Sequence, residues 1–399
     1  MNRRLVRPVL SCLAAASLAI LAGRTNAGGE HCRVIAECPP PVDPSGDPGP
    51  VVDRAPEVRI ALLLDTSNSM DGLIAQAKAQ LWSVVNEFQH CERDGKKPEL
   101  RIALYEYGNN SISSGTRWVR QVMPFTTDLD LLSERLFALT TNGGQEYCGE
   151  AIQRSTAELA WRNCPGDLNM IVIAGNEPFT QGTTHYAEAI ADAVRRNIRV
   201  HTVFCGSRSE GIETKWQDGA VLGRGGYTAI DHTKDVPDCR TPFDDEMTRL
   251  GSEINTTYLP YGDTGAEGAA RQMEMDRKVM AARPASAPDR AAAKGGSAYR
   301  NENWDLVDAI KEKRVDLDAL QDAELPPAMQ TLPKDRRAKY VEEMAARRAE
   351  IARRLQELGQ KRAEFVRRQA KDDGRVTLGD ALVAEIRKQA SETGYTFKE

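Results

Sequence analysis

The sequence predicts an α/β protein whose central unit is a doubly wound, mostly parallel sheet with helices on both faces. Two observations support this prediction. Residues 58–64 form a near-continuous apolar run, which is typical of a strand buried on both faces. Beyond this run, stretches with strand character alternate with stretches of helical periodicity as far as Tyr258. In such sheets ligands bind beyond the carboxyl ends of the strands, so a site is expected in those loops.

The expected elements follow in order along the chain. After the first strand, the spacing of Leu73, Ala77, Leu81 and Phe88 predicts a helix. The other expected elements are strands at 100–107, 118–125, 169–174, 198–205 and 226–230, and helices at 128–139, 149–161, 186–196, 210–223 and 242–258.

The first residues predict export. Arg3, Arg4 and Arg7 precede an apolar stretch at 9–22, and small residues then lead to Ala27. This pattern is typical of a signal peptide at 1–27, with a mature chain that begins near Gly28 in the periplasm, at the cell surface or in the medium. The apolar stretch is too short to span a membrane, and no later apolar run reaches the required length.

Cysteine usage agrees with an oxidising compartment, where structural disulfides are expected. No CxxC pair of the kind found in zinc or redox sites occurs. Cys32 with Cys38 would close a small loop and Cys205 with Cys239 a larger one, although the pairing cannot be read from the sequence. The seven cysteines after Cys12 are Cys32, Cys38, Cys91, Cys148, Cys164, Cys205 and Cys239, and their odd number leaves one free or intermolecular.

Composition divides the rest of the chain. Proline density predicts a Pro-rich linker at 28–54, either a stiff spacer or a disordered leader, before a main domain at 55–262. Residues 263–300 are rich in Ala, Gly, Pro and Ser with little periodicity, which predicts a flexible linker. Residues 301–399 are expected to form a helical region.

This helical region is expected to contain a long helix at 334–368 and a second helix opened by a capping box from Thr377 to Asp380. One apolar stripe on each helix predicts a hairpin that buries its seam internally or against the main domain, and a partner-binding coiled coil is the alternative. The seam of the long helix consists of Val341, Met344, Ile351, Leu355, Leu358 and Phe365, and Arg348 and Arg362 interrupt it.

Several functional classes find no support. The net charge is −5 with mixed signs, which is unlike the clustered basic surface that nucleic acid requires. Neither a Gly-x-Ser-x-Gly elbow nor a phosphate-binding Gly-rich loop occurs. Ser67, His185 and Asp65 could assemble into a triad in space, but nothing in their spacing favours it.

The best candidate site follows the first strand, where the sequence reads Asp65-Thr66-Ser67-Asn68-Ser69. A carboxylate and two hydroxyls at i, i+2 and i+4, in a loop between a buried strand and a helix, can converge on one point. Hard oxygen ligands of this kind suit Mg²⁺ or Ca²⁺. The alternative interpretation is that Ser67 and Ser69 only cap the helix that follows.

This Asp-x-Ser-x-Ser segment, first in a series of alternating strands and helices, resembles the von Willebrand factor type A family over residues 55–262. The resemblance implies a metal-dependent adhesion site in which Asp65, Ser67 and Ser69 hold a divalent cation such as Mg²⁺. It also implies metal-assisted protein recognition rather than catalysis.

The sequence departs from the family pattern in two loops. The family takes a further ligand from a Thr in a later loop, which here is 142–149 and lacks that Thr. Glu146 is the best substitute, with Thr140 and Thr141 further back. The family also has an Asp after the fourth buried strand, where this sequence has Gly175.

Two consequences of the missing carboxylate are expected. The site should bind its cation more weakly, and the bound cation should attract an outside carboxylate more strongly. Asn176 and Glu177 follow at the strand end but match the pattern poorly. A Gly175→Asp change is expected to tighten metal binding, provided that Gly175 does not need a positive φ.

These observations favour a non-enzymatic module of the cell envelope that binds a protein partner with the help of a divalent cation. A structural scaffold with a vestigial metal site is the first alternative, and an enzyme or a chelatase accessory protein is the second. The cation ligands expected are Asp65, Ser67, Ser69 and Glu146, and the partner-binding residues expected are Asn68, Asp71, Gln145, Asn176 and Glu177.

Overall fold

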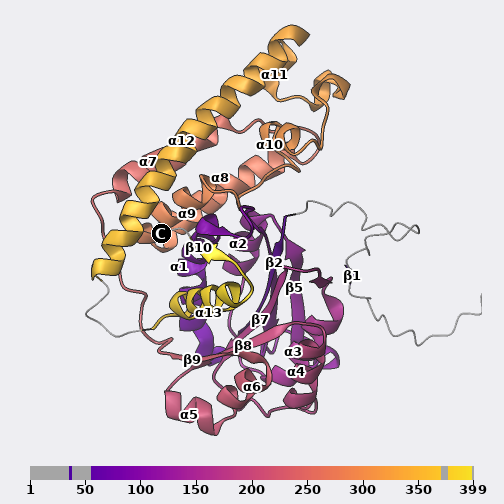
Figure 1. Ribbon diagram of the computed structural model, residues 1–399, viewed down its shortest axis with the longest axis vertical. Coiled ribbons are helices and arrows are strands. Elements are labelled where there is room, and N and C mark those ends of the chain that lie inside the picture. Colours follow the sequence, from indigo (N-terminus) through magenta and orange to yellow (C-terminus); the bar gives the residue numbers. More distant parts are fainter. Residues whose placement is uncertain (1–35, 38–54, 370–375, 398–399) are drawn as a thin grey trace, which may run out of the picture. The chain divides into compact units, whose positions relative to one another are not determined.

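A computed structural model describes residues 36–37, 55–369 and 376–397. The signal peptide expected at 1–27 lies outside the described residues, as does most of the Pro-rich segment. Figure 1 shows the strands of the central sheet side by side, with helices on either side of them. The expected fold class, a mostly parallel sheet followed by a C-terminal helical region, is confirmed.

The central sheet has six strands in the order β5-β4-β2-β7-β8-β9. Five of them run parallel, and β5 pairs with β4 in the antiparallel sense at one edge. Because β2 lies inside the sheet, its carboxyl end at Asp65 opens between the loops that follow β4 and β7. The strands are β2 (Glu57–Asp65), β4 (Glu99–Tyr107), β5 (Val119–Thr126), β7 (Leu168–Gly175), β8 (Arg199–Cys205) and β9 (Arg224–Ile230).

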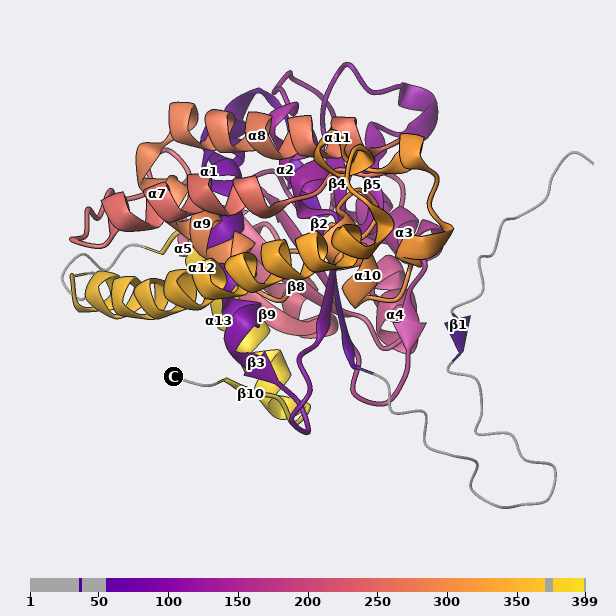
Figure 2. The same cartoon turned by 90° about the horizontal axis from the view of Figure 1, so that it is seen from above.

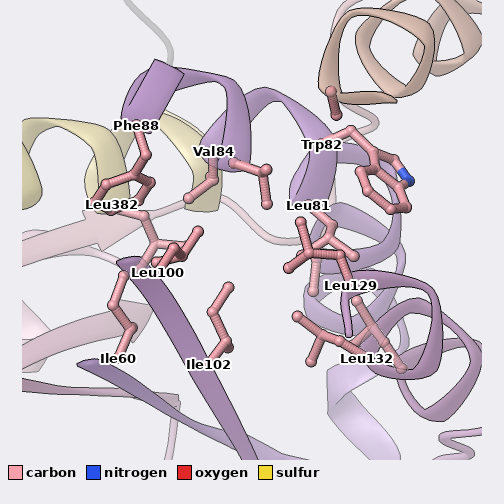
Figure 3. Packing of buried hydrophobic residues seen from close by; sticks show 14 of the residues in the cluster. Ile60, Leu81, Trp82, Val84, Phe88, Leu100, Ile102, Leu129, Leu132 and Leu382 are labelled. Atoms are coloured by element: carbon pink, nitrogen blue, oxygen red, sulfur yellow. The ribbon is translucent and has the colours of Figure 1, made fainter. Parts of the chain in front are cut away.

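Alternation along β2 divides the interior into two cores, because successive side chains of a strand point to opposite faces. Ile60 and Leu64 pack with α1 (Asp71–Glu87), α2 (Leu129–Phe137) and α13 (Leu378–Glu392). Figure 3 shows part of this core, with Ile60 near Leu100 and Ile102 beneath residues of α1. Ala61 and Leu63 pack on the other face, whose helices are α3 (Cys148–Glu158), α4 (Tyr186–Arg195) and α6 (Trp216–Leu222).

Two expected helices are shorter or broken. The helix expected at 210–223 is divided into α5 (Arg208–Glu213) and α6, because Lys215 between them has a left-handed backbone with φ of 74°. The helix expected at 242–258 is α7 (Asp244–Glu253), which continues as a 3-10 turn at Ile254–Thr257. Short strand pairs join β1 (Ala36–Glu37) to β6 (Arg162–Asn163) and β3 (Cys91–Glu92) to β10 (Thr396–Phe397).

The segment 263–300, for which a flexible linker was expected, forms two packed helices instead. They are α8 (Gly265–Ala282) and α9 (Ala287–Lys294). Their buried faces combine small and polar residues such as Gln272, Ala292 and Arg290 with a few larger apolar side chains. A search for large apolar residues at helical spacing therefore overlooks these helices.

The long helix α12 (Lys334–Gln369) packs on α7, α9 and the short helix α10 (Leu306–Lys311). Figure 2 shows α7 and α12 as neighbouring rods. The arginines that interrupt its apolar seam make ion pairs inside this contact. Arg348 pairs with Asp305 and Asp308 and lies 3.9 Å from the ring centre of Tyr258, and Arg362 pairs with Asp244 and Asp289. Other helices of this chain therefore cover the apolar seam of α12. A further helix, α11 (Pro327–Gln330), precedes α12.

Helix α13 packs on α1 and on the sheet rather than forming a closed hairpin with α12. Two buried or half-buried glutamines on α1 hold its beginning. Gln76 donates to the carbonyls of Asp231 and Lys234 and accepts the Leu378 N–H at 3.0 Å. Gln80 bonds to Thr377 and to the Gly379 N–H. Helix α1 thus holds both ends of the long segment that connects β9 to α13.

The cysteines differ from the expected pairing. Cys205 and Cys239 are free, as are Cys91 and Cys148. Cys205 is buried in β8, whereas Cys239 is half-buried. Cys164 is disulfide-bonded, and Cys32 and Cys38 lie outside the described residues. Within the described ranges, no helix combines the length and the apolar character that crossing a membrane requires.

Candidate metal centre

Asp65 ends β2 and is fully buried at the carboxyl edge of the sheet. Its Oδ1 accepts the Ser67 backbone N–H at 2.8 Å, whereas its Oδ2 is buried without a hydrogen-bond partner among the described residues. Burial raises the pKa of Asp65 to about 7, hydrogen bonds from Ser67 oppose part of the rise, and the charge of Glu177 adds to it. A buried carboxylate oxygen without a partner is costly, and a bound cation would compensate it.

The hydroxyls of Ser67 and Ser69 lie in the turn between β2 and α1, with their oxygens 3.5 Å apart. Ser67 precedes the 3-10 turn at Asn68–Met70, and its side chain makes no capping hydrogen bond there. The N-cap of α1 itself is Met70, which also lacks a side-chain cap. The alternative that these serines only cap the helix is therefore contradicted, and both hydroxyls remain available to a ligand.

Asn176 brings an amide to the same place from the end of β7. Its Nδ2 donates to Ser69 Oγ at 3.1 Å, and its Oδ1 is buried without a partner among the described residues. Amide carbonyl oxygens are accepted ligands of hard cations. Asn176, expected on the partner-binding rim, thus lies in contact with the proposed ligand Ser69.

Gly175 cannot carry the carboxylate that the family pattern has at this position. A Cβ placed on Gly175 would lie 2.4 Å from Tyr107 Oη and 3.0 Å from Asp65 Oδ2. Tyr107 is fully buried, and its hydroxyl donates to the Ala174 carbonyl at 2.9 Å, so the ring has no room to move. We therefore expect a steric barrier to Gly175→Asp, although Gly175 has no positive φ that would disfavour a side chain.

Glu146 lies beside Asp65, as expected from the sequence. The two carboxylates flank Gly108, where an added Cβ would stand 2.9 Å from Asp65 Oδ1 and 3.0 Å from Glu146 Cγ. Gly108 has a φ of 81°, so both its backbone and its surroundings require glycine. Burial and the negative charge of Asp65 raise the pKa of Glu146 to about 7. The hydroxyl of Thr141, another candidate for the missing ligand, donates to Asp71.

The expected partner-binding residues form the rim. Asn68, Asp71 and Gln145 are exposed, and Asn176 and Glu177 are half-buried. Sequence reasoning missed Gln181, whose Oε1 accepts the Glu146 N–H at 3.2 Å and whose Nε2 donates to Glu177 at 3.3 Å. Gln181 follows a proline turn at no recognisable spacing from the motif, so the sequence contains no signal for it.

These residues fit a hard divalent cation only as a mixed donor set. Across the described ranges, no three His, Cys, Asp or Glu side chains are grouped so that they could hold a metal ion by themselves. Hydroxyl and amide oxygens would have to complete the coordination, which suits Mg²⁺ or Ca²⁺ better than a softer metal.

The structure does not assemble the triad that sequence spacing left open. His185 occupies the N-cap of α4, where its ring stacks on Tyr186. Asp65 accepts hydrogen bonds from Ser67, but among the described residues no hydrogen bond joins the His185 side chain to Asp65 or Ser67. His201 is buried in β8 and contacts Glu385 and Gln389 of α13.

Residues 60–212, from within β2 to within α5, match the family model of the von Willebrand factor type A domain. No protein of curated function matches the sequence. Among solved structures, the chain is similar to the conserved hypothetical protein BatB from Bacteroides thetaiotaomicron, with 18% identity and a TM-score of 0.34 over 44% of this chain and 90% of that chain.

Two further structures are similar at the same level. Proximal thread matrix protein 1 from the mussel byssus, with a zinc-occupied MIDAS motif, shows 14% identity and a TM-score of 0.35, covering 46% of this chain and 44% of that chain. An aerotolerance-related membrane protein from Bacteroides fragilis shows 17% identity and a TM-score of 0.30, covering 44% of this chain and 92% of that chain. Each likeness spans less than half of this chain.

Proposed function

This chain belongs to the von Willebrand factor type A domain family through residues 60–212, and on this premise we propose that it is a non-enzymatic, protein-binding module of the cell envelope. It contacts its partner through the loops around Asp65 with the help of a divalent cation. The observation that carries the proposal is the pair of buried oxygens without partners, Asp65 Oδ2 and Asn176 Oδ1, at the ends of adjacent strands.

Asp65, Ser67 and Ser69 would hold the cation, with Glu146 and Asn176 beside them. A bound divalent cation would supply positive charge to two buried carboxylates and an open coordination position to an outside oxygen. Ser67 Oγ and Ser69 Oγ accept no capping hydrogen bond, so their lone pairs are available for this purpose. Mg²⁺ is the first candidate because it favours few protein ligands.

The rim favours recognition over catalysis. Asn68, Gln145 and Asp71 are exposed around the opening and can contact another protein without rearrangement. A protein surface is therefore the ligand that this site suits best.

The location in the envelope rests on the sequence of residues 1–27, with its arginines, apolar stretch and Ala27. We expect the mature chain to begin near Gly28. Cell fractionation with N-terminal sequencing tests this, and a cytoplasmic protein that retains Met1 would disprove it.

Thermal unfolding tests the cation. Millimolar Mg²⁺, Mn²⁺ or Ca²⁺ should raise the melting temperature of the wild type, because a ligand that binds only the folded state stabilises it. Asp65→Ala should remove this effect, and Glu188→Gln, which removes an exposed carboxylate on α4, should keep it. A wild-type melt that ignores all three cations would refute the proposal.

A scaffold role is the second candidate, and one observation favours it. The 36-residue helix α12 presents much of its length to solvent while its seam binds this chain. If the helical part carries the partner contact, capture of the partner would survive Asp65→Ala in the full-length protein. Loss of capture in that variant favours the cation-assisted module.

A further inference from the structure

The candidate metal centre is more acidic than the sequence suggests, because two carboxylates lie together there and the charge of a third acts on both. Asp65 and Glu146 flank Gly108, and Gln181 accepts the Glu146 backbone N–H and donates to the Glu177 carboxylate. The negative charge of Glu177 acts on both of the other carboxylates. Glu177 therefore belongs to the electrostatic environment of the cation, even though it matches no position of the family motif.

No basic side chain of the described residues neutralises this group. The ion pairs in the loops around the site involve other carboxylates, such as Glu106 with Arg120 and Glu150 with Arg117. Asp65, Glu146 and Glu177 form none among the described residues, and Asp65 Oδ2 is fully buried without any partner. The unpartnered Oδ2 is the sign, independent of the acidic residues as such, that the group awaits a positively charged ligand.

One divalent cation does not balance three carboxylates. Two positive charges against three negative ones leave an excess negative charge at the mouth of the site, on the side of Glu177. The rim residues expected from the sequence add no compensation, because Asn68, Gln145 and Asn176 are neutral amides and Asp71 is a further exposed acid. The cation would thus be less electropositive than the sequence suggested when it indicated a missing carboxylate.

The charge of the approaching group follows from this balance. An acidic side chain would bring a fourth negative charge into a partly desolvated place, where like charges repel strongly. A basic side chain would meet Glu177 while a neutral backbone or amide oxygen of the same partner completes the cation's coordination. The exposed amides of the rim can hydrogen-bond to an acidic or to a basic side chain. The choice between the two therefore depends on the carboxylates of the site.

We propose that the partner docks here with a lysine or arginine side chain that pairs with Glu177 beside the cation, and that an acidic side chain is rejected. Glu177 is then the residue that determines the specificity of this surface. This inference rests on the proposed function, since it assumes that a cation binds Asp65 and that the loops around it form a protein-binding surface.

The test uses the full mature chain and two immobilised synthetic peptides, hexalysine and hexaglutamate. Calorimetry first establishes Mn²⁺ binding by the wild type, by Glu177→Gln and by Glu188→Gln. Surface plasmon resonance at low ionic strength then measures the affinity of each Mn²⁺-loaded protein for both peptides. Glu188→Gln changes the net charge by the same amount as Glu177→Gln but lies on the exposed face of α4.

The wild type should bind hexalysine more tightly than hexaglutamate. Glu177→Gln should weaken hexalysine binding about tenfold, as loss of one partner of a close charge pair does, whereas Glu188→Gln should change it by less than about twofold. The inference is overturned if hexalysine does not bind the wild type more tightly than hexaglutamate, or if both variants weaken it equally. Absence of Mn²⁺ binding overturns the proposed function together with this inference; Mn²⁺ binding with preference for hexaglutamate overturns this inference alone.

Discussion

Arg290 of α9 donates from Nη1 to Oδ1 of Asp130 in α2 over 2.7 Å, and both side chains are only 2% exposed. Its Nε donates to Asp276 and its Nη2 to the Gln272 carbonyl. The guanidinium carbon lies 4.6 Å from the ring centre of Trp82 in α1. One buried arginine thus connects the helices after β9 to α1 and α2, two of the helices that cover one face of the sheet.

Removing this arginine should destabilise the whole protein. Arg290→Met leaves Asp130 and Asp276 without their charge partner, and breaking a buried ion pair from one side costs about 3 to 5 kcal/mol. Urea unfolding measures the loss. Arg277→Met, which removes an exposed arginine of α8 paired with Glu274, is the matched control and should cost far less, because solvent screens an exposed pair. Equal effects of the two changes would contradict a structural role for the buried pair.

The same cluster shows how far the sequence could lead. Strand alternation and the Asp65 loop were readable because apolar runs and a short local motif encode them. Helices α8 and α9 could not be predicted in this way. Their buried faces combine small residues with Arg290 and Lys294, which bond to acidic side chains of other helices. The position of Gln181 and the closure around Gly175 depend on contacts between remote segments as well. Such contacts leave no periodicity to read.

A fragment of residues 55–262 should not fold stably, contrary to what the domain boundaries expected from the sequence imply. It lacks α13, whose Leu382 and Ile386 cover the sheet and α1 in the larger core. Exposing this face forfeits roughly 1.5 to 3 kcal/mol for each large apolar side chain. Near-ultraviolet circular dichroism and thermal unfolding, compared with a fragment of residues 55–397, check this prediction. Cooperative unfolding of the short fragment at an unchanged temperature would count against it.

Gln76 should be nearly as important as a large core residue, although it is polar. It is 2% exposed and bonds to three backbone groups, the carbonyls of Asp231 and Lys234 and the N–H of Leu378. Gln76→Leu removes these bonds while keeping similar bulk, so buried backbone groups lose partners at about 1 to 3 kcal/mol each. Chemical denaturation should show a loss of at least about 2 kcal/mol. Gln356→Leu on α12, which removes a single half-buried bond to the Gly295 carbonyl, is the comparison and should cost less.

Asp65→Asn should raise the stability of the cation-free protein while abolishing stabilisation by Mg²⁺. Because the folded-state pKa of about 7 lies above the ordinary value of 3.8, the stability that Asp65 contributes is complete below pH 3.8 and is lost as the pH rises through 7. At pH 8 without metal, the asparagine should therefore gain about 2 to 4 kcal/mol, and near pH 4 the gain should vanish. Urea unfolding at both pH values, with a chelator present, measures this. An asparagine variant less stable than the wild type at pH 8 would show that the buried carboxylate is compensated in another way.

Asn176→Asp, not Gly175→Asp, should strengthen the metal centre. The Asn176 side chain already bonds to Ser69 Oγ at 3.1 Å, and its buried Oδ1 lacks a partner among the described residues, so a carboxylate of the same shape fits without new contacts. A further anionic oxygen should tighten Mg²⁺ or Mn²⁺ binding by about tenfold or more in calorimetry, and the cation-free form should lose stability because another buried acid joins Asp65 and Glu146. Gly175→Asp should instead cost at least about 1 to 3 kcal/mol, since its Cβ would stand 2.4 Å from Tyr107 Oη, and it should not improve metal affinity. Tighter binding by the Gly175 variant than by the Asn176 variant would mean that Tyr107 yields, and that the family's usual carboxylate position is open in this protein after all.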